Sequence, residues 1–190
     1  MVAIGTQKLT LADYLADDDG SEQPHELVDG QRVPMPPESD INQRIASLLF
    51  AFFLQQGIPF YRLRIGTEIV VLGSSATARL PDLLVLSEEL ALALEGASRS
   101  TVMMEMPPPL LVVEVVSPGQ ENRDYRYKRS EYAARGIAEY WIVDPMQQCL
   151  TLLEWVDGLY EEQCYTGDRP IVSPQLGELT ISAAQILAGR

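Results

Sequence analysis

Histidine, lysine and cysteine are scarce in this chain of 190 residues. The one histidine, His25, is the sole basis for a His-ligated zinc site or a Ser-His-Asp triad, and we expect it to cap or pack instead. The two cysteines, Cys149 and Cys164, are too few for a disulfide framework. No apolar run approaches the roughly 18 residues of a membrane span, since the longest covers residues 48–54. Residues 1–10 lack the apolar core of a signal peptide, so we expect a cytoplasmic protein.

Positive charge is also in deficit, because 14 Lys and Arg against 27 Asp and Glu give a formal net charge of −13. A protein that coats nucleic acid without specificity needs many cations for phosphate contacts, so this balance argues against that class. A local basic site is not excluded, because five of the fourteen basic residues fall within residues 123–135. Arg123, Arg126 and Arg129 are candidates for phosphate contacts, although their positions around a helix prevent all three from facing one duplex.

The composition is that of an ordinary globular protein, with 46% hydrophobic and 22% charged residues. No repeat or linker divides the chain, so we predict a single domain over residues 1–190. Hydrophobic spacing and capping residues predict helices at 11–18, 39–57, 87–96, 124–135 and 181–187, the first of them capped by Thr10 and ended by an Asp-rich loop to Gly20. Strands are predicted at 61–66, 66–73, 78–86, 110–116 and 139–145, with hairpins turning at 29–30 and 157–158 and a loop at 100–109. This order predicts an α/β (α+β) fold with a mixed central sheet flanked by helices.

Glu114 interrupts the apolar run at 110–116, which is typical of a central strand covered on both faces. A buried carboxylate there must be paired, protonated or bound to a metal, because an unpaired buried charge costs several kcal/mol. Pairing with an arginine is the plain alternative. Asp82 follows Pro81 at the start of another apolar strand, and two carboxylates from adjacent strands suit a hard divalent cation. For Asp82 the plain alternative is a Pro-Asp pair that only begins a strand.

The helix at 124–135 carries a polar stripe. At 100° per residue one face holds Asp124, Lys128, Glu131, Tyr132 and Arg135. Lys128 is one of only two lysines, against twelve arginines, so its compact charge or its ability to lose a proton is a candidate reason for its presence. Judged on spacing alone, a solvated face with an Asp124–Lys128 pair is the favoured interpretation.

If residues 157–158 form a two-residue turn, residue 156 faces 159 and residue 151 faces 164. Cys149 then lies diagonal to Cys164 at about 7 Å, which is long for a disulfide. Ser117, just beyond Glu114, is interpreted as a turn residue, and a contact with the site is left open.

Three motifs in a fixed order resemble a known family. They are PD at 81–82, LVVEVVSP at 111–118 and RDYRYKRSEYAARGIAEYWIVDP at 123–145. This set, with HELVDG at 25–30, resembles the Uma-type putative restriction endonuclease family of the PD-(D/E)XK nuclease superfamily. The resemblance covers about residues 10–185, and it implies a restriction-endonuclease-like fold.

By this resemblance, Asp82 and Glu114 would be catalytic carboxylates that bind Mg²⁺, with Mn²⁺ as a substitute. The backbone carbonyl of Val115 would be a further metal ligand, and Glu26 would complete the acidic cluster. The chain departs from the superfamily at Val116, where the catalytic lysine usually stands; here that role would pass to Lys128 on the following helix.

The resemblance therefore implies a Mg²⁺-dependent endonuclease that hydrolyses DNA, in which Lys128 assists the attacking water. The acidic net charge predicts weak, salt-sensitive DNA binding, and assembly into a homodimer is left open. The shifted lysine and the charge of −13 also favour an alternative, a nuclease fold that has lost catalysis and acts as a DNA- or protein-binding module. A non-nuclease α/β protein would require Asp82 and Glu114 to lie far apart.

Overall fold

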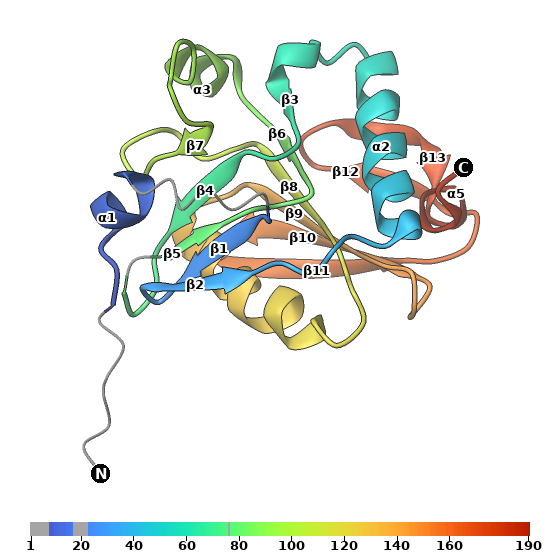
Figure 1. Cartoon of the computed structure of the whole chain (residues 1–190). Coiled ribbons are helices and arrows are strands. Elements are labelled where there is room, and N and C mark those ends of the chain that lie inside the picture. The colour runs from blue at the N-terminus through green and yellow to red at the C-terminus, as the bar shows by residue number, and fades with distance from the viewer. Residues whose placement is uncertain (1–7, 17–22, 76) are drawn as a thin grey trace.

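A six-stranded mixed sheet forms the centre of the computed structural model, which describes residues 8–16, 23–75 and 77–190 (Figure 1). In spatial order its strands are β11 (Leu159–Tyr165), β10 (Cys149–Val156), β9 (Glu139–Asp144), β8 (Leu111–Val115), β6 (Leu83–Val85) and β3 (Leu63–Arg64). The β8–β9 pair is parallel and the other pairs are antiparallel. This is the mixed central sheet that the sequence predicts.

A second mixed sheet packs beside the first one. Its order is β2 (Gln31–Pro34), β1 (His25–Val28), β5 (Thr77–Arg79), β4 (Glu68–Val71) and β7 (Thr101–Val102). A separate hairpin, β12 (Pro170–Ser173) with β13 (Gly177–Ser182), follows β11 in the chain. The sequence did not predict this hairpin, and β7 lies in the segment that was predicted to be a loop.

Helices cover both faces of the central sheet (Figure 1). The α-helices are α1 (Leu11–Ala16), α2 (Asp40–Gln55), α3 (Glu88–Ala93), α4 (Arg129–Arg135) and α5 (Ala183–Ala188), and a 3₁₀ turn spans Phe60–Arg62. Helices α2 and α5 pack on one face, whereas α3, α4 and β4 pack on the other. Within the part of the chain that the structure describes, no helix is long and apolar enough to cross a membrane.

Local sequence signals set several element ends as predicted. Ser39 caps α2, and its hydroxyl accepts a hydrogen bond from the Asn42 N–H. Asp29 and Gly30 form the β1–β2 turn, both with positive φ. Gly30 is required there for a second reason, because a Cβ at this position would lie 2.9 Å from the Lys8 Cβ. The predicted loop to Gly20 lies outside the described residues.

Several element boundaries differ from the predictions; for example, the strand expected at 61–66 is reduced to β3, because Phe60–Arg62 form a 3₁₀ turn. The strand expected at 78–86 is broken at Pro81, which has no N–H to donate to a neighbouring strand. The residues before it pair in the five-stranded sheet, and those after it pair in the six-stranded sheet. The chain therefore passes from β5 in one sheet to β6 in the other, and Asp82 lies at the crossing. At the C-terminus, Ile181 and Ser182 end β13, so α5 begins at Ala183, after its Ser182 cap, rather than at Ile181.

Side-chain alternation in β8 sets the direction of Glu114. Val113 and Val115 belong to the core cluster beneath α2 and α5, whereas Val112 and Val116 belong to the cluster beneath α4. Successive strand residues point to opposite faces, so Glu114 faces α4 with Val112 and Val116. All five β8 residues are buried, as the apolar run predicts.

A disulfide links Cys149 to Cys164, with their Cα atoms 6.4 Å apart. The predicted register of this hairpin is confirmed, since Val156 pairs with Leu159 and Thr151 with Cys164. The expectation that the diagonal is too long for a disulfide is wrong. Strand twist brings the two Cα atoms within the range of about 4.4–6.8 Å that a disulfide spans.

Glu139 joins the β12–β13 hairpin to the central sheet. It is fully buried at the start of β9, and its oxygens accept hydrogen bonds from Trp141 Nε1 (2.5 Å), Ser173 Oγ (2.8 Å) and the Gln175 N–H (3.0 Å). Both carboxylate oxygens of Glu139 act as acceptors, so neither can be replaced by a group that donates a hydrogen bond.

Glu139→Gln should lower the free energy of unfolding by about 1–3 kcal/mol, because either amide orientation sets an NH₂ group against a donor. Urea unfolding of the variant and of Glu154→Gln measures this effect. Glu154 lies opposite Glu139 on β10 but is exposed, so its variant should stay within about 0.5 kcal/mol of the wild type. Equal losses in the two variants would contradict the fastening role of Glu139.

Candidate active site

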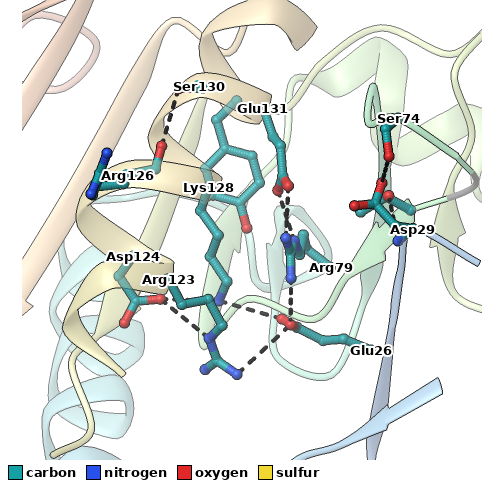
Figure 2. Close-up of polar contacts among 12 residues, drawn as sticks. Glu26, Asp29, Ser74, Arg79, Arg123, Asp124, Arg126, Lys128, Ser130 and Glu131 are labelled. Carbon is teal, nitrogen blue, oxygen red and sulfur yellow. Dashed lines mark hydrogen bonds and ion pairs between the residues drawn. The ribbon is translucent and has the colours of Figure 1, made fainter. Parts of the chain in front are cut away.

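Lys128 is the centre of the candidate site. Its side chain is fully buried, and its ammonium lies 2.6 Å from Glu114 Oε2, 3.3 Å from Asp124 Oδ1 and 3.4 Å from Glu26 Oε1. Figure 2 shows Lys128 reaching from its helix toward Glu26, which lies on β1. The fold thus joins three of the predicted site residues, from elements that are far apart in the sequence.

A π-helical segment at Arg123–Lys128 presents this lysine. The segment continues into α4, which ends at Gly136 as predicted. Asp124 and Lys128 are both buried, so the interpretation of this stripe as a solvated face is wrong, although the Asp124–Lys128 pair itself is present. The wider turn was not predicted; such π-helical turns are frequent at functional sites.

The charges around Lys128 shift the acidity of the whole group. Burial alone would lower the pKa of the Lys128 ammonium, but Glu114 and the other two carboxylates raise it above its ordinary value. Burial raises the pKa of the Glu114 carboxyl to about 8, because desolvation and the neighbouring carboxylates together outweigh the attraction of Lys128. The Tyr132 hydroxyl also donates to Glu114 Oε1 at 2.7 Å. Lys128 is therefore held as a cation beside a carboxyl whose charge is incompletely compensated.

Asp82 lies next to Glu114 at the start of β6. Its Oδ2 accepts a 2.6 Å hydrogen bond from the Val115 N–H on the neighbouring strand. Burial raises the pKa of Asp82 to about 7, with the Glu38 and Asp124 carboxylates adding to the effect. Leu83 pairs with Val113, so the preceding Asp82 lies beside the part of β8 that carries Glu114, and its carboxyl adds to the burial that raises the pKa of Glu114. The non-nuclease interpretation requires the two residues to lie far apart, which they do not.

The backbone of Val115 is held on both sides. Its N–H donates to Asp82, and its carbonyl accepts a 3.3 Å hydrogen bond from Asn42 Nδ2 on α2. The same Asn42 amide nitrogen donates to Ser117 Oγ at 3.0 Å, so Ser117 touches the edge of the site. A carbonyl oxygen has two lone pairs, so the Asn42 contact leaves one for another partner. That Val115 is a metal ligand stays a prediction.

Glu26 is fixed by a second buried ion pair (Figure 2). Arg79 donates to Glu26 Oε2 at 2.9 Å and binds both oxygens of Glu131 at 2.7 Å. Although burial alone would raise the pKa of Glu26, Lys128, Arg79 and Arg123 lower it to about 2. Glu26 is therefore a carboxylate at any ordinary pH, as the predicted acidic cluster requires.

Arg79 is the site residue that the sequence analysis missed. Its side chain is 2% exposed, and its partners Glu26 and Glu131 lie about fifty residues away on each side in the sequence. The available signal is a single arginine between apolar residues, two positions before Pro81. That signal shows burial but does not identify a partner.

The three predicted phosphate contacts differ in their surroundings. Arg129 pairs with Glu162 at 2.5 Å, and Arg123 lies 3.8 Å from Glu26 and 3.7 Å from Asp124. Arg126 is exposed. The single histidine, His25, begins β1 and is half-buried, and its backbone carbonyl accepts a hydrogen bond from the Tyr14 hydroxyl. Arg126 is thus the most accessible of the three arginines.

The donors at Asp82 and Glu114 fit a hard divalent cation, because they are the oxygens of two carboxyl groups beside the backbone carbonyl of Val115. Across residues 8–16, 23–75 and 77–190, no three His, Cys, Asp or Glu side chains are arranged to hold a metal ion. Two carboxylates are nevertheless a common protein contribution to Mg²⁺ binding, because this ion usually retains water and takes further oxygens from phosphate.

Comparisons with known proteins give a family and a fold. The family model Uma2, described as "Putative restriction endonuclease", matches residues 11–184. A crystal structure of a putative nuclease belonging to DUF820 from Anabaena variabilis ATCC 29413 matches with a TM-score of 0.74 and 17% identity, over 95% of this chain and 98% of that one. At that identity the likeness shows the fold. No curated protein matches the chain.

Proposed function

The chain belongs to the Uma2 family of putative restriction endonucleases, and from this premise we propose that it is a Mg²⁺-dependent endonuclease that hydrolyses DNA phosphodiester bonds. The observation that carries the proposal is the buried contact of Glu114 with Lys128 beside Asp82. Two carboxyl groups and one ammonium at the end of two adjacent strands are the groups that metal-assisted phosphodiester hydrolysis needs.

Asp82 and Glu114 would hold the metal, with the Val115 carbonyl as the predicted third ligand. When bound there, Mg²⁺ would lower the pKa of a water and compensate charge on a phosphoryl oxygen. The chain itself keeps the two carboxyl groups in place: the Val115 N–H holds Asp82, and the Tyr132 hydroxyl holds Glu114. Both groups are fixed by neighbours before substrate binds, which lowers the cost of ordering them.

Lys128 supplies a fixed positive charge. Its pKa is raised by three carboxylates, so it stays an ammonium and orients the attacking water rather than removing its proton. The same charge stabilises the negative charge that develops on the phosphoryl group. Glu26 and Arg79 hold this ammonium in position, because Arg79 fixes Glu26 and Glu26 contacts Lys128.

Mg²⁺ should raise the melting temperature of the protein, because a ligand that binds only the folded state stabilises it by mass action, by about 2.7 kcal/mol at 100 times the dissociation constant. Asp82→Asn and Glu114→Gln should each abolish that rise. Thermal melts with and without Mg²⁺ test this, with Glu89→Gln as a control that makes the same charge change on the exposed face of α3. If all four proteins respond equally to Mg²⁺, the metal is not bound at Asp82 and Glu114.

A further inference from the structure

A cavity of about 660 Å³ opens beside Asp82 and is not explained by the metal site alone. Its walls are mostly apolar, from the turn after β2, the start of α2 and the β5–β6 crossing. They include Met35, Pro36, Ala46, Ile65, Leu80 and Pro81. This volume lies within the range of about 300–1,000 Å³ that small-molecule sites occupy. The cavity can therefore take a group of the size of a nucleoside.

The polar groups of the cavity favour a base over a second phosphate as its occupant. The described residues that line it include no Lys, Arg or His, but they include the amides of Asn42 and Gln43 and the hydroxyl of Ser47. Phosphates are bound by cations and backbone N–H groups, whereas flat apolar rings with hydrogen-bonding edges suit apolar walls with a few amides. A phosphodiester held at Asp82 would carry its nearest base into this space.

Glu38 adds a specific acceptor. It lines the cavity, and its Oε2 is buried with no hydrogen-bond partner among the residues that the structure describes. Glu38 and Asp82 both line this cavity, so the unpartnered acceptor and the proposed metal-binding carboxyl share one space. A buried acceptor without a donor is costly, so a ligand that brings an N–H group would be favoured there.

We propose that this cavity holds one unpaired nucleobase beside the cleaved phosphate, and that Glu38 selects a base with an exocyclic amino group, such as cytosine. The inference rests on the proposed nuclease function and adds a substrate class to it. Unstacking a base costs least in single-stranded or mismatched DNA, so such DNA is the preferred substrate. Carboxylates accept hydrogen bonds from the cytosine amino group, whereas uracil presents a carbonyl oxygen at the same position.

NMR titration of the protein with dCMP and with dUMP, in Mg²⁺, tests this selection without any cleavage. The wild type should bind dCMP roughly tenfold to a hundredfold more tightly than dUMP, the ratio that one hydrogen bond to a charged group gives. Glu38→Gln should bring the two affinities close together, because an amide can both donate and accept. Glu95→Gln, which changes an exposed glutamate outside the cavity, should keep the wild-type ratio.

Two filling variants test the location. Ala46→Leu and Ser47→Leu both place a larger side chain in the cavity, and Ser47 is exposed, so its variant should fold even if the Ala46 variant does not. Each folded variant should bind both nucleotides at least tenfold more weakly. Equal wild-type affinities for dCMP and dUMP, a ratio unchanged in Glu38→Gln, or wild-type binding by a folded filling variant would overturn the inference.

Glu38→Gln should also leave the Mg²⁺-dependent rise in melting temperature intact. Its loss would assign Glu38 to the metal site and overturn the base-selecting role. Plasmid nicking by the wild type separates this inference from the proposed function: nicking without a dCMP preference removes only the base site, whereas a dCMP preference without nicking removes the nuclease.

Discussion

Lys128→Arg should slow Mg²⁺-dependent DNA cleavage by roughly 10²–10⁴-fold while leaving DNA binding nearly unchanged. The variant keeps the positive charge but replaces a compact ammonium with a wide planar guanidinium. In the structure that charge is enclosed by Glu114, Asp124 and Glu26 at 2.6–3.4 Å, so the larger group cannot keep the same position. Catalysis depends on that position, whereas binding depends only on the charge.

The control for this variant is Lys8→Arg, which makes the same exchange at the chain's other lysine, an exposed residue. Overpacking a core costs about 1–3 kcal/mol, so cleavage should be compared below the melting temperature of the Lys128 variant. The assay needs low salt, because an acidic protein with a small basic patch loses DNA as ionic strength rises. Equal cleavage rates for the two variants would remove Lys128 from the mechanism.

Arg79→Met should lower the free energy of unfolding by about 3–5 kcal/mol, because it leaves the buried Glu26 without its closest cation and Glu131 without its partner. Urea unfolding measures the loss. The matched control is Arg44→Met, since Arg44 pairs with Asp40 at 3.9 Å on the exposed face of α2 and should cost less than about 1 kcal/mol.

The double variant Arg79→Met with Glu26→Gln tests the cause of that loss. If the cost comes from an uncompensated carboxylate, removing the charge of Glu26 should recover part of it, and the two changes should be less than additive. Strict additivity would show that Arg79 stabilises the fold through packing alone. That result would also weaken its assignment as the residue that positions Lys128 through Glu26.

The parts of the fold that the sequence predicts are those with a local signal. The β10–β11 register follows from the Asp157-Gly158 turn, and burial of β8 follows from an apolar run. Ser39 indicates the start of α2, because its hydroxyl caps the helix. The break at Pro81 has a local signal too, but the proline does not tell to which sheet each half of the segment belongs.

In the candidate site, too, the residues that the sequence predicts are those with a local signal. Asp82, Glu114 and Lys128 stand out because a charged residue in an apolar run, or a rare lysine, is visible in the sequence. Arg79 does not stand out, because its role depends on a pairing with Glu131, 52 residues away, that only the fold creates. The π-helical turn is hidden for a similar reason: the stripe drawn at 100° per residue is interpreted as a solvated face, whereas Asp124 and Lys128 on it are buried.

Incubating the purified wild type with supercoiled plasmid at low salt, in Mg²⁺ and in EDTA, tests the central claim most directly. We expect nicked and then linear DNA in Mg²⁺, with none in EDTA and none with Asp82→Asn. Supercoiled, linear and single-stranded DNA that all stay intact in both Mg²⁺ and Mn²⁺ would contradict it, and would favour a nuclease fold that only binds.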